Sequence, residues 1–327
     1  MTLEFPVRTH TGLLKLRSQH TMAEEASAGP SGASIALAGW IRARSGGVND
    51  ALDLCADCGP ARGRGVVALE AIEKGAELLR IPRDIALTAR SHATGTVDTR
   101  LPDTDGFKAL SPYLRTALVV LREKLHGESP WAAVFASFPA AFDLARSWSP
   151  EEQKELRGTE TSAMLRLGSG AGRGGSAIEV VWRSDIAPLL ALPEHRDAWA
   201  GANLASFSWA CDCTTSRGFD DEMTDSSGYG SNFRVISSSF WFKGPYLLPA
   251  VDMLNHDAAT PCTSLTVLED GSFAMIAERA IAKGEEVCHR YQDLPDSRLL
   301  ITYGFTLGDA NAIPPAPRVT LEVRLYV

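Results

Sequence analysis

The chain has 327 residues, of which 45% are hydrophobic and 22% charged, and its formal net charge is −8 at pH 7. That length suffices for one large domain or two modest ones, and the composition is ordinary for a soluble globular protein. No apolar run approaches the roughly 18 residues of a membrane span, which argues against a membrane protein, and the negative charge argues against nonspecific nucleic-acid binding and favours a basic protein or peptide partner.

The first segment, residues 1–34, shows little periodicity and is rich in Thr, Ser, Ala and Gly. We therefore expect a flexible leader, with order beginning near Ile35. The leader has basic and hydroxyl residues, as organellar transit peptides do, whereas Glu4, Glu24 and Glu25 weaken that interpretation. The predicted compartment is the cytoplasm or nucleus, or the chloroplast if the leader is a transit peptide.

Strand patterns come next, and helical patterns follow them. Val66–Leu69 and Glu77–Ile81 read as short β-strands. Ser111-Pro112 then forms an N-cap and first-turn pair, and apolar residues recur every 3.6 positions after it as far as Leu125. Ser149–Glu152 predicts a second helix that starts with a capping box. The pattern predicts a third helical stretch from Glu194 to Cys211.

Strand patterns return in the last third of the chain. Leu265–Leu268 and Phe273–Ala277 flank the turn Glu269–Ser272 and predict a hairpin. The pattern I-x-K-G-x-E occurs twice, at Ile72–Glu77 and Ile281–Glu286, each time with a turn glycine before an extended run. The order of strands, helical middle and strands, with this repeat on both sides, indicates a β fold that is split by a helical insertion.

Several polar residues stand in apolar surroundings near the end of the chain. Asn255 and His256 follow an apolar run, Tyr291 ends a predicted strand, and Tyr303 precedes Gly304-Phe305. Buried polar groups need partners, so together these residues predict a pocket that holds something polar.

Each of these residues also has a simpler interpretation when it is taken alone. Tyr291 could be a strand-end tyrosine with its hydroxyl in water, and Tyr303 could belong to the core. Asn255-His256 could form a turn corner, or a metal pair with neighbouring aspartates. Arg217 could be a surface arginine. These interpretations do not predict the common order and spacing of the set.

Two other patterns carry less weight. Cys55-x-x-Cys58 and Cys211-x-Cys213 could together bind zinc, but their spacing matches no standard zinc motif, so we expect reduced thiols and no metal. Residues 170–175 match the G-x-G-x-x-G of dinucleotide-binding folds. They lack a preceding strand and a βαβ unit, so we expect a mobile loop there.

Taken in chain order, several motifs resemble the SET-domain protein methyltransferases, in particular the branch typified by the plant Rubisco large-subunit lysine methyltransferase. The resemblance covers about residues 40–310. The motifs that carry it are Arg62–Ala68 (R-G-R-G-V-V-A), Trp148–Glu152 (W-S-P-E-E), Leu156–Thr159 (L-R-G-T), Trp209-Ala210, Ser216-Arg217, Asp252–Asp257 (D-M-L-N-H-D), Gly284–Val287 with Tyr291, and Tyr303–Phe305.

The resemblance implies an α+β fold: a SET fold of small curved β-sheets with a threaded C-terminal segment, split by a helical insertion. The SET domain would span residues 35–310, and the insertion about 90–205. The resemblance also implies S-adenosylmethionine as cofactor. The expected activity is protein-lysine N-methylation of a non-histone protein, whose lysine side chain is the substrate.

Site residues carry over from the family position by position. Cofactor contacts are implied for six residues, the catalytic role falls on Tyr291, and the substrate channel is implied to be lined by Tyr303 and Phe305. The six cofactor-binding residues are Gly63, Arg64, Arg217, Asp252, Asn255 and His256. Glycines in the first turn would let the backbone approach the cofactor closely, and Arg217 could pair with its carboxylate.

The chain also departs from the family pattern. Leu294–Arg298 stands where relatives commonly have Ser-Asn after the catalytic tyrosine. Residues 311–327 resemble the start of a truncated C-terminal substrate-binding region, whose apolar face could seek a partner chain. These departures leave open a non-catalytic SET-fold adaptor. Because related branches methylate histidine, the resemblance also leaves open a protein-histidine methyltransferase.

Overall fold

A computed structural model of the chain describes residues 30–60, 62–89, 100–168, 177–219, 234–235, 245–291 and 294–307. For residues 166–168, 177 and 234–235 it describes the backbone only. The Gly-rich run at 170–175, most of the predicted leader and the C-terminal segment 311–327 lie outside the described residues.

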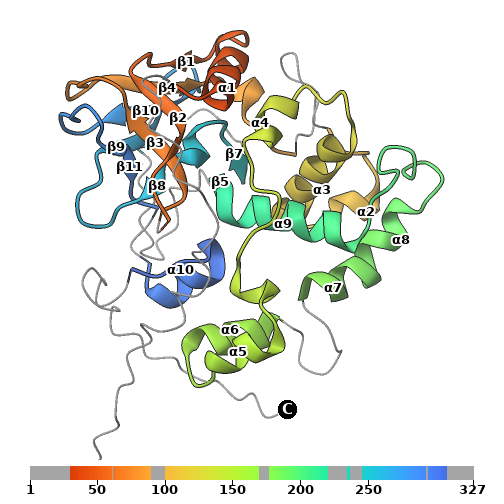
Figure 1. Ribbon diagram of the computed structural model, residues 1–327. Coiled ribbons are helices and arrows are strands. Elements are labelled where there is room, and N and C mark those ends of the chain that lie inside the picture. The colour runs from red at the N-terminus through yellow and green to blue at the C-terminus, as the bar shows by residue number, and fades with distance from the viewer. Residues whose placement is uncertain are drawn as a thin grey trace, which may run out of the picture.

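A seven-stranded mixed sheet forms the β half of the molecule (Figure 1). Its strand order is β1-β4-β10-β9-β11-β8, and β6 pairs with β9. The strands are β1 (Gly47–Val48), β4 (Glu77–Ile81), β6 (Arg234–Val235), β8 (Asn255–His256), β9 (Thr263–Val267), β10 (Phe273–Ala277) and β11 (Cys288–His289). Two smaller sheets pair β2 (Leu52–Asp57) with β3 (Arg64–Ala68), and β5 (Gly218–Phe219) with β7 (Tyr246–Leu247).

The predicted hairpin between β9 and β10 is confirmed. The two strands are antiparallel, with Phe273 opposite Val267. Gly271 adopts a φ of +82° in the turn, and the Leu268 N–H donates to the Ser272 carbonyl at 2.8 Å. The left-handed conformation costs glycine little, because it has no Cβ.

The two copies of the I-x-K-G-x-E pattern lie side by side and bond to each other. Ile72 and Ile281 exchange both backbone hydrogen bonds, each at 2.9 Å. Gly75 and Gly284 have φ values of +86° and +80°, and each donates its N–H to the last residue of the strand that precedes the other copy. The repeat therefore joins the two halves of the β fold across the helical insertion.

Helices fill the chain between β4 and β5, apart from the gaps in the described residues (Figure 1). They are the 3₁₀ turns Arg83–Ile85 and Ala145–Ser147, α2 (Asp105–Lys108), α3 (Pro112–Leu125), α4 (Ala132–Ala136), α5 (Pro150–Glu155), α6 (Glu160–Gly168), α7 (Ala177–Val181), the π-helix Trp182–Ile186, α8 (Ala187–Leu190) and α9 (Leu204–Arg217). A last helix, α10 (Asp296–Tyr303), follows the sheet and contacts α6 and α9.

Two of the predicted helix starts are confirmed. Ser111 caps α3 by accepting the Leu114 N–H, with Pro112 in the first turn. Ser149 and Glu152 form the predicted capping box at the start of α5. In both places the signal is local, because the cap and its partner lie within four residues.

The third helix begins later than the sequence pattern predicts. Residues 194–201 form turns, and α9 begins at Leu204 and ends at Arg217. Asn203 caps it, accepting the Ser206 N–H at 3.0 Å, and the Ser206 hydroxyl completes a capping box. A helix that begins at this cap presents its last turn, with Arg217, to the sheet.

Regular structure also begins earlier than Ile35. Helix α1 spans Gly32–Arg42, and the Ser31 hydroxyl accepts the Ser34 N–H at its start. The helix packs on β2 and α4. Its Trp40 side chain donates to the Pro130 carbonyl at 2.6 Å, so α1 is tied to the helical region as well as to the sheet.

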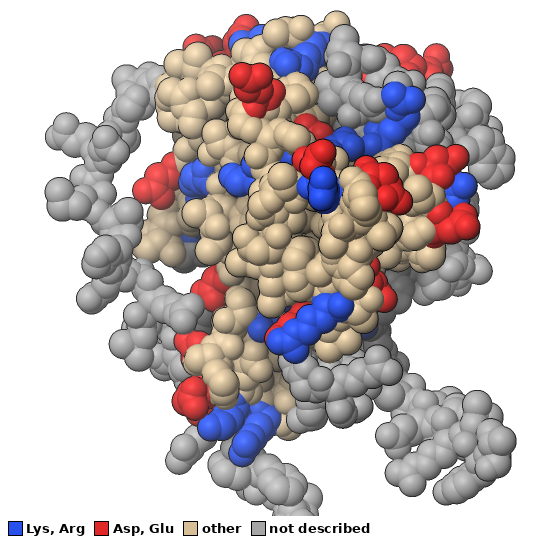
Figure 2. Space-filling view, turned by 90° about the vertical axis from the view of Figure 1, so that its right-hand side faces the viewer, with Lys and Arg blue, Asp and Glu red and all other residues tan. Residues whose placement is uncertain are grey.

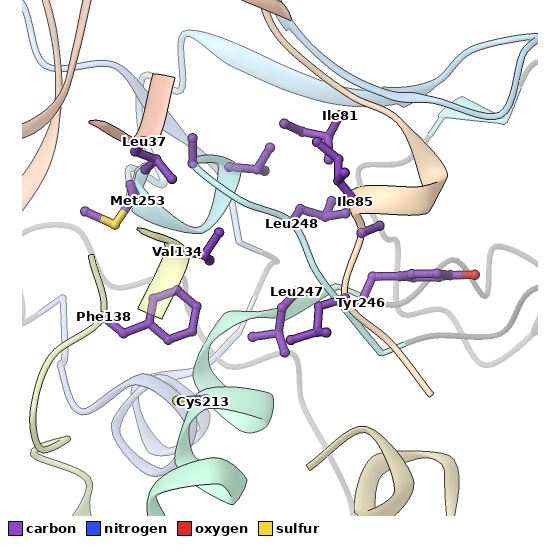
Figure 3. Close-up of a cluster of buried hydrophobic side chains, with 14 of the residues drawn as sticks. Leu37, Ile81, Ile85, Val134, Phe138, Cys213, Tyr246, Leu247, Leu248 and Met253 are labelled. Carbon is purple, nitrogen blue, oxygen red and sulfur yellow. The ribbon is translucent and has the colours of Figure 1, made fainter. Parts of the chain in front are cut away.

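The hydrophobic core is shared by the sheet and the helices (Figure 3). Figure 3 draws its centre, where β7 and the turn after it meet side chains from the helical insertion. Residues far apart in sequence converge there: Leu37, Ile81, Ile85, Val134, Phe138, Cys213, Tyr246, Leu247, Leu248 and Met253. Burial of this apolar surface is the main driving force that holds the insertion on the sheet.

Acidic and basic side chains are interspersed on the face shown in Figure 2. Within the described part of the chain, no helix combines the length and the apolarity that crossing a bilayer requires.

Candidate functional site

The chain reaches the site through a strained turn after β7. Ala250 adopts a φ of +66° although it carries a Cβ, and it is 1% exposed. Backbone strain of this kind costs about 1 kcal/mol or more and is often found at functional sites. The turn leads into the 3₁₀ segment Val251–Met253 and then into β8, which brings Asp252 and the Asn255-His256 corner next to one another.

Asp252 and Arg217 form a buried ion pair. Arg217 Nη1 donates to Asp252 Oδ2 at 2.7 Å and to the Asp252 carbonyl at 3.1 Å, and the Asp252 side chain is 1% exposed. Burial raises the pKa of Asp252, and the Arg217 charge opposes that rise. Arg217 Nε and Asp252 Oδ1 are also buried, and neither has a hydrogen-bond partner among the described residues.

Aromatic rings surround the Arg217 guanidinium. Its Cζ atom lies 5.0 Å from the ring centroid of Phe138 and 5.8 Å from that of Phe142. A guanidinium over aromatic faces is stabilised by cation–π attraction while it keeps unused N–H donors. Arg217 is therefore held in place with an N–H group that could donate a hydrogen bond to an acidic ligand group.

A second set of contacts, which we call the polar cluster, consists of Arg62, Asn255 and Glu286. Glu286 Oε2 pairs with Arg62 Nε, and Glu286 Oε1 accepts Asn255 Nδ2 at 2.7 Å. Asn255 Nδ2 also lies within hydrogen-bond distance of the Arg62 and Arg64 carbonyls, at 3.3 and 3.2 Å. The cluster ties the first turn to the Asn-His corner, which lies almost 200 residues later.

Gly65 sits inside the polar cluster and leaves no room for a side chain. A Cβ at this position would come within 2.7 Å of Cys58 Sγ and within 2.8 Å of both Asn255 Nδ2 and Glu286 Oε1. Gly63 differs, because its φ is +67° and no heavy atom of the described residues lies within 4 Å of its ideal Cβ. The first turn is therefore packed at Gly65 and open at Gly63.

Tyr291 follows β11 and is held by two hydrogen bonds. Its hydroxyl donates to the Leu254 carbonyl at 2.9 Å, and its N–H donates to His256 Nδ1 at 3.0 Å. Burial raises the pKa of the phenol well above its usual value, with the Tyr303 hydroxyl among the smaller contributions that raise it further. The interpretation of Tyr291 as a strand-end tyrosine with its hydroxyl in water is therefore wrong.

Four other rings surround Tyr291, and we call the five together the aromatic cluster. The ring centroids of Tyr303, His289 and His256 lie 4.7, 4.9 and 5.2 Å from that of Tyr291, and Phe305 lies at 6.3 Å. Tyr303 ends α10, and Gly304 then turns the chain with a φ of +84° so that Phe305 also reaches the cluster.

His256 belongs to the aromatic cluster and also contacts the polar cluster. Its carbonyl accepts Arg62 Nη2 at 3.2 Å, and its Nδ1 accepts the Tyr291 N–H. An imidazole nitrogen that accepts an amide proton must carry a lone pair, which a doubly protonated ring lacks. His256 is therefore held as a neutral ring with its proton on Nε2.

The structure thus brings the sequence-predicted residues together, but it changes the roles of some side chains. Asn255 was expected to contact the cofactor, and its amide nitrogen lies against the Arg62 and Arg64 carbonyls of the first turn and against Glu286. The proposed partner of Arg217 was a ligand carboxylate, whereas Asp252 already occupies one of its nitrogens. Arg64 is exposed at the start of β3, and its charge acts on Asp252.

Sequence reasoning missed three residues of the site: Arg62, Glu286 and His289. All three lie inside motifs that were recognised, yet none was singled out. An alternation signal was present for two of them, because extended chain places residues two apart on one face. Glu286 and Cys288 share the face toward Arg62, and His289 shares the face of Tyr291.

The altered segment Leu294–Arg298 opens helix α10. Pro295 precedes the helix, Ser297 Oγ donates to Glu160 Oε2 of α6 at 2.7 Å, and Asp296 Oδ1 accepts the Leu307 N–H at 2.9 Å. These contacts hold both ends of the α10 region. Tyr303 therefore lies in the aromatic cluster although the sequence of residues 294–298 departs from the family pattern.

The four cysteines that were considered as zinc ligands belong to different elements of the fold. Cys55 and Cys58 belong to the β2 strand and its turn, whereas Cys211 and Cys213 are buried in α9, and all are free thiols. No group of three or more His, Cys, Asp or Glu residues in the described ranges is arranged to hold a metal ion.

Comparison with known proteins gives a family match over most of the chain. The sequence model of the SET domain matches residues 63–292. That span includes both clusters except for Arg62, Tyr303 and Phe305. It also includes the whole helical insertion.

Three curated relatives illustrate the similarity, at 22–26% identity with the chain. Ribosomal lysine N-methyltransferase 4 of Saccharomyces cerevisiae is 26% identical over 79% of this chain and 51% of its own length. N-lysine methyltransferase SETD6 of Rattus norvegicus is 25% identical over 85% and 56%. The chloroplastic Rubisco large-subunit N-methyltransferase of Pisum sativum is 22% identical over 80% and 49%. The chain therefore spans about half the length of these relatives.

Solved structures confirm the expected fold. A structure of Rubisco LSMT bound to AdoMet superposes with a TM-score of 0.62 at 20% identity, over 86% of this chain and 58% of that one. The SET domain of LSMT bound to lysine and AdoHcy gives a TM-score of 0.61 at 18% identity, over 84% and 57%.

Proposed function

Because the chain belongs to the SET-domain family, we propose that it is an S-adenosylmethionine-dependent protein-lysine N-methyltransferase that acts on a non-histone protein. The observation that carries this proposal is the position of Tyr291, which joins the Asn-His corner to a ring of aromatic side chains. The names of the relatives, which refer to ribosomal lysine and to Rubisco, support a non-histone protein as the target.

The residues present suit S-adenosylmethionine, which would supply a methyl group on positively charged sulfur. Gly63 is open where a Cβ would otherwise project, so a ligand can approach the backbone there. The buried Arg217 Nε has no partner among the described residues, and it could donate to the carboxylate of the amino-acid part. Asp252 and the Asn255-His256 corner would position Arg217 and the backbone around it.

Tyr291 would hold the target amine and not remove its proton. Its own proton is donated to the Leu254 carbonyl, so the lone pairs of Oη remain available to accept. The raised pKa keeps the phenol neutral at physiological pH, and a neutral phenol is a weak base. The amine therefore has to arrive neutral, and the aromatic surroundings favour the neutral form because they offer little solvation to a charge.

The site supports transfer through placement more than through acid–base chemistry. Methyl transfer is an in-line displacement, so its rate depends on how well the amine is aligned with the methyl carbon. The Tyr291 hydroxyl is fixed by one hydrogen bond and its backbone by another. An acceptor held in this way loses no orientational freedom when the amine binds.

The test is methyl transfer from labelled S-adenosylmethionine to proteins of a cell extract, with free lysine and free histidine as separate acceptors. We expect label in acid-stable methyl-lysine. Label in methyl-histidine would replace the lysine assignment, and S-adenosylhomocysteine binding without any labelled protein would favour a non-catalytic adaptor. The compartment stays a prediction: cytoplasm or nucleus, or chloroplast if residues 1–34 are a transit peptide.

A further inference from the structure

His289 is a buried imidazole with an unused polar atom. The residue lies in β11 and is 6% exposed. The Nε2 atom is buried and has no hydrogen-bond partner among the residues that the structure describes. A buried polar atom without a partner costs free energy of folding, so a native protein that keeps one often uses it.

The backbone places His289 in the aromatic cluster. In the extended chain, His289 and Tyr291 lie two residues apart and so on the same face. The two ring centroids are 4.9 Å apart, and the ring of Phe219, at the end of β5, also stacks on His289 at 6.0 Å. The neighbouring Cys288 points to the opposite face, where Arg62 Nη2 lies 3.1 Å from its sulfur. His289 therefore belongs to the face that carries Tyr291.

The imidazole is neutral at working pH. Burial, and to a smaller extent the nearby His256, lower its pKa to about 3. A neutral ring has one nitrogen that donates and one that accepts. It can bind a polar group without adding a second positive charge beside a sulfonium.

We propose that His289 is a further substrate-orienting residue of this site, and that its Nε2 accepts one N–H of the target amine beside the Tyr291 hydroxyl. This inference rests on the proposed function. It extends that function by giving the target nitrogen a second acceptor, on a residue to which the family resemblance assigned no role.

Two acceptors fix a neutral primary amine. Such an amine has two N–H groups and one lone pair, so donation to Tyr291 Oη and to His289 Nε2 leaves the lone pair for the methyl carbon. When the amine takes the methyl group, the N–C bond forms as the S–C bond breaks, and the positive charge passes from sulfur to nitrogen. The N–H groups become more acidic during this step, so both hydrogen bonds strengthen in the transition state. The surplus proton then leaves the product to water.

Two variants separate this role from packing. His289→Leu puts an apolar side chain of similar size in place of the imidazole and so removes the acceptor. His289→Gln places an amide oxygen at a similar distance from the backbone and retains an acceptor. S-adenosylhomocysteine binding, followed by calorimetry, serves as the folding and cofactor control for both variants.

The experiment is a titration of free lysine at pH 9, where neutral amine is more abundant than at pH 7, into chain saturated with S-adenosylhomocysteine. Nitrogen NMR of histidine-labelled protein reports the His289 Nε2 shift, which is assigned by its loss in the glutamine variant. We expect lysine to move this resonance in the wild-type chain. We also expect His289→Leu to weaken lysine binding about tenfold and His289→Gln by less than threefold.

Four outcomes would overturn the proposal. If the wild-type chain binds S-adenosylhomocysteine but lysine leaves the His289 resonance unchanged, His289 does not contact the amine and the proposed function still stands. Equal lysine affinity of the leucine variant and the wild type leads to the same conclusion, as does an equal loss in both variants, which would indicate packing. A folded wild-type chain that does not bind S-adenosylhomocysteine contradicts the proposed function, and this inference with it.

Discussion

The polar cluster and the aromatic cluster share one short segment of chain, residues 286–291, yet they differ in charge, hydrogen bonding and ring packing. Glu286 and Cys288 face the polar cluster, where an ion pair and several hydrogen bonds cross to the first turn. His289 and Tyr291 face the aromatic cluster, which has few polar contacts and close ring packing. Because successive side chains of an extended segment point to opposite faces, the same stretch of backbone contributes to a polar environment on one face and to an aromatic one on the other.

This difference suggests a division of labour. The polar cluster fixes the first turn, where the backbone is open at Gly63, and should therefore control cofactor affinity. The aromatic cluster surrounds the hydroxyl that would receive the target amine, and should therefore control transfer. Substitutions in the polar cluster should change cofactor affinity and leave the rate of methyl transfer from bound cofactor nearly unchanged. Substitutions in the aromatic cluster should do the reverse.

The largest difference between the effect on methyl transfer and the effect on cofactor affinity is expected for Tyr291→Phe. This change removes the hydroxyl and its bond to the Leu254 carbonyl but keeps the ring in the aromatic cluster. We expect methyl transfer to fall about 100-fold, the size of effect that misplacement of a reacting group can have, while S-adenosylhomocysteine affinity stays within threefold. Single-turnover transfer and calorimetry measure the two quantities, and unchanged turnover would show that another residue holds the amine.

Gly65→Ala should disrupt the packing of the polar cluster. The new Cβ would press on Cys58 Sγ, Asn255 Nδ2 and Glu286 Oε1, all closer than 3.0 Å. Overpacking of this kind costs about 1–3 kcal/mol, so we expect S-adenosylhomocysteine affinity to fall about 30-fold. Gly39→Ala is the matched control: Gly39 is an exposed position in α1, and the described residues place no neighbouring heavy atom within 4 Å of its ideal Cβ. Equal affinities of the two variants would contradict the role of the polar cluster.

The acid stability of the fold tests whether His289 is neutral. An unfolded histidine takes up a proton near pH 6.5, whereas folded His289 does so only near pH 3. The unfolded chain therefore binds more protons, and the stability contributed by neutral His289 is present above pH 6.5 and is lost as the pH falls toward 3. Between pH 7.5 and 5, we expect the wild type to lose about 2 kcal/mol more than His289→Leu. Denaturant titrations at both pH values measure this, and equal losses would mean that the imidazole is protonated in the folded chain.

The smallest effect is expected for Glu286→Gln. The amide can still accept from Asn255, but the charge opposite Arg62 is lost. This pair is partly exposed, so we expect only about a fivefold loss of S-adenosylhomocysteine affinity and no change in the transfer step. Glu285→Gln provides the control, since Glu285 pairs with Arg279 at 2.6 Å outside both clusters. A loss of equal size in the control would point to a general charge effect.

Sequence patterns predict the parts of the fold that short-range chemistry determines. The caps at Ser111 and Ser149 and the turn at Gly271 each depend on a few neighbouring residues, and the structure confirms all three. The start of α9 differs from its prediction because an apolar pattern continues upstream of the real cap, Asn203. A cap is a weaker signal than periodicity, so periodicity alone places the start of this helix too early.

Contacts between distant segments could not be predicted from the residues alone. The Arg62–Glu286 pair joins positions that are 224 residues apart, and the Arg217–Asp252 pair depends on the strained turn at Ala250. The family resemblance located the site and suggested which residues belong to it. It did not reveal that the Asn255 side chain faces the first turn, because that depends on the packing around Gly65.

The measurement that tests the division between the two clusters most directly is a calorimetric titration of S-adenosylhomocysteine into the purified chain, beside the Tyr291→Phe and Gly65→Ala variants. We predict binding of one molecule per chain in the wild type and in Tyr291→Phe, and clearly weaker binding in Gly65→Ala. A folded wild-type chain that releases no heat of binding would contradict the assignment of a cofactor site to the first turn and the Asn-His corner.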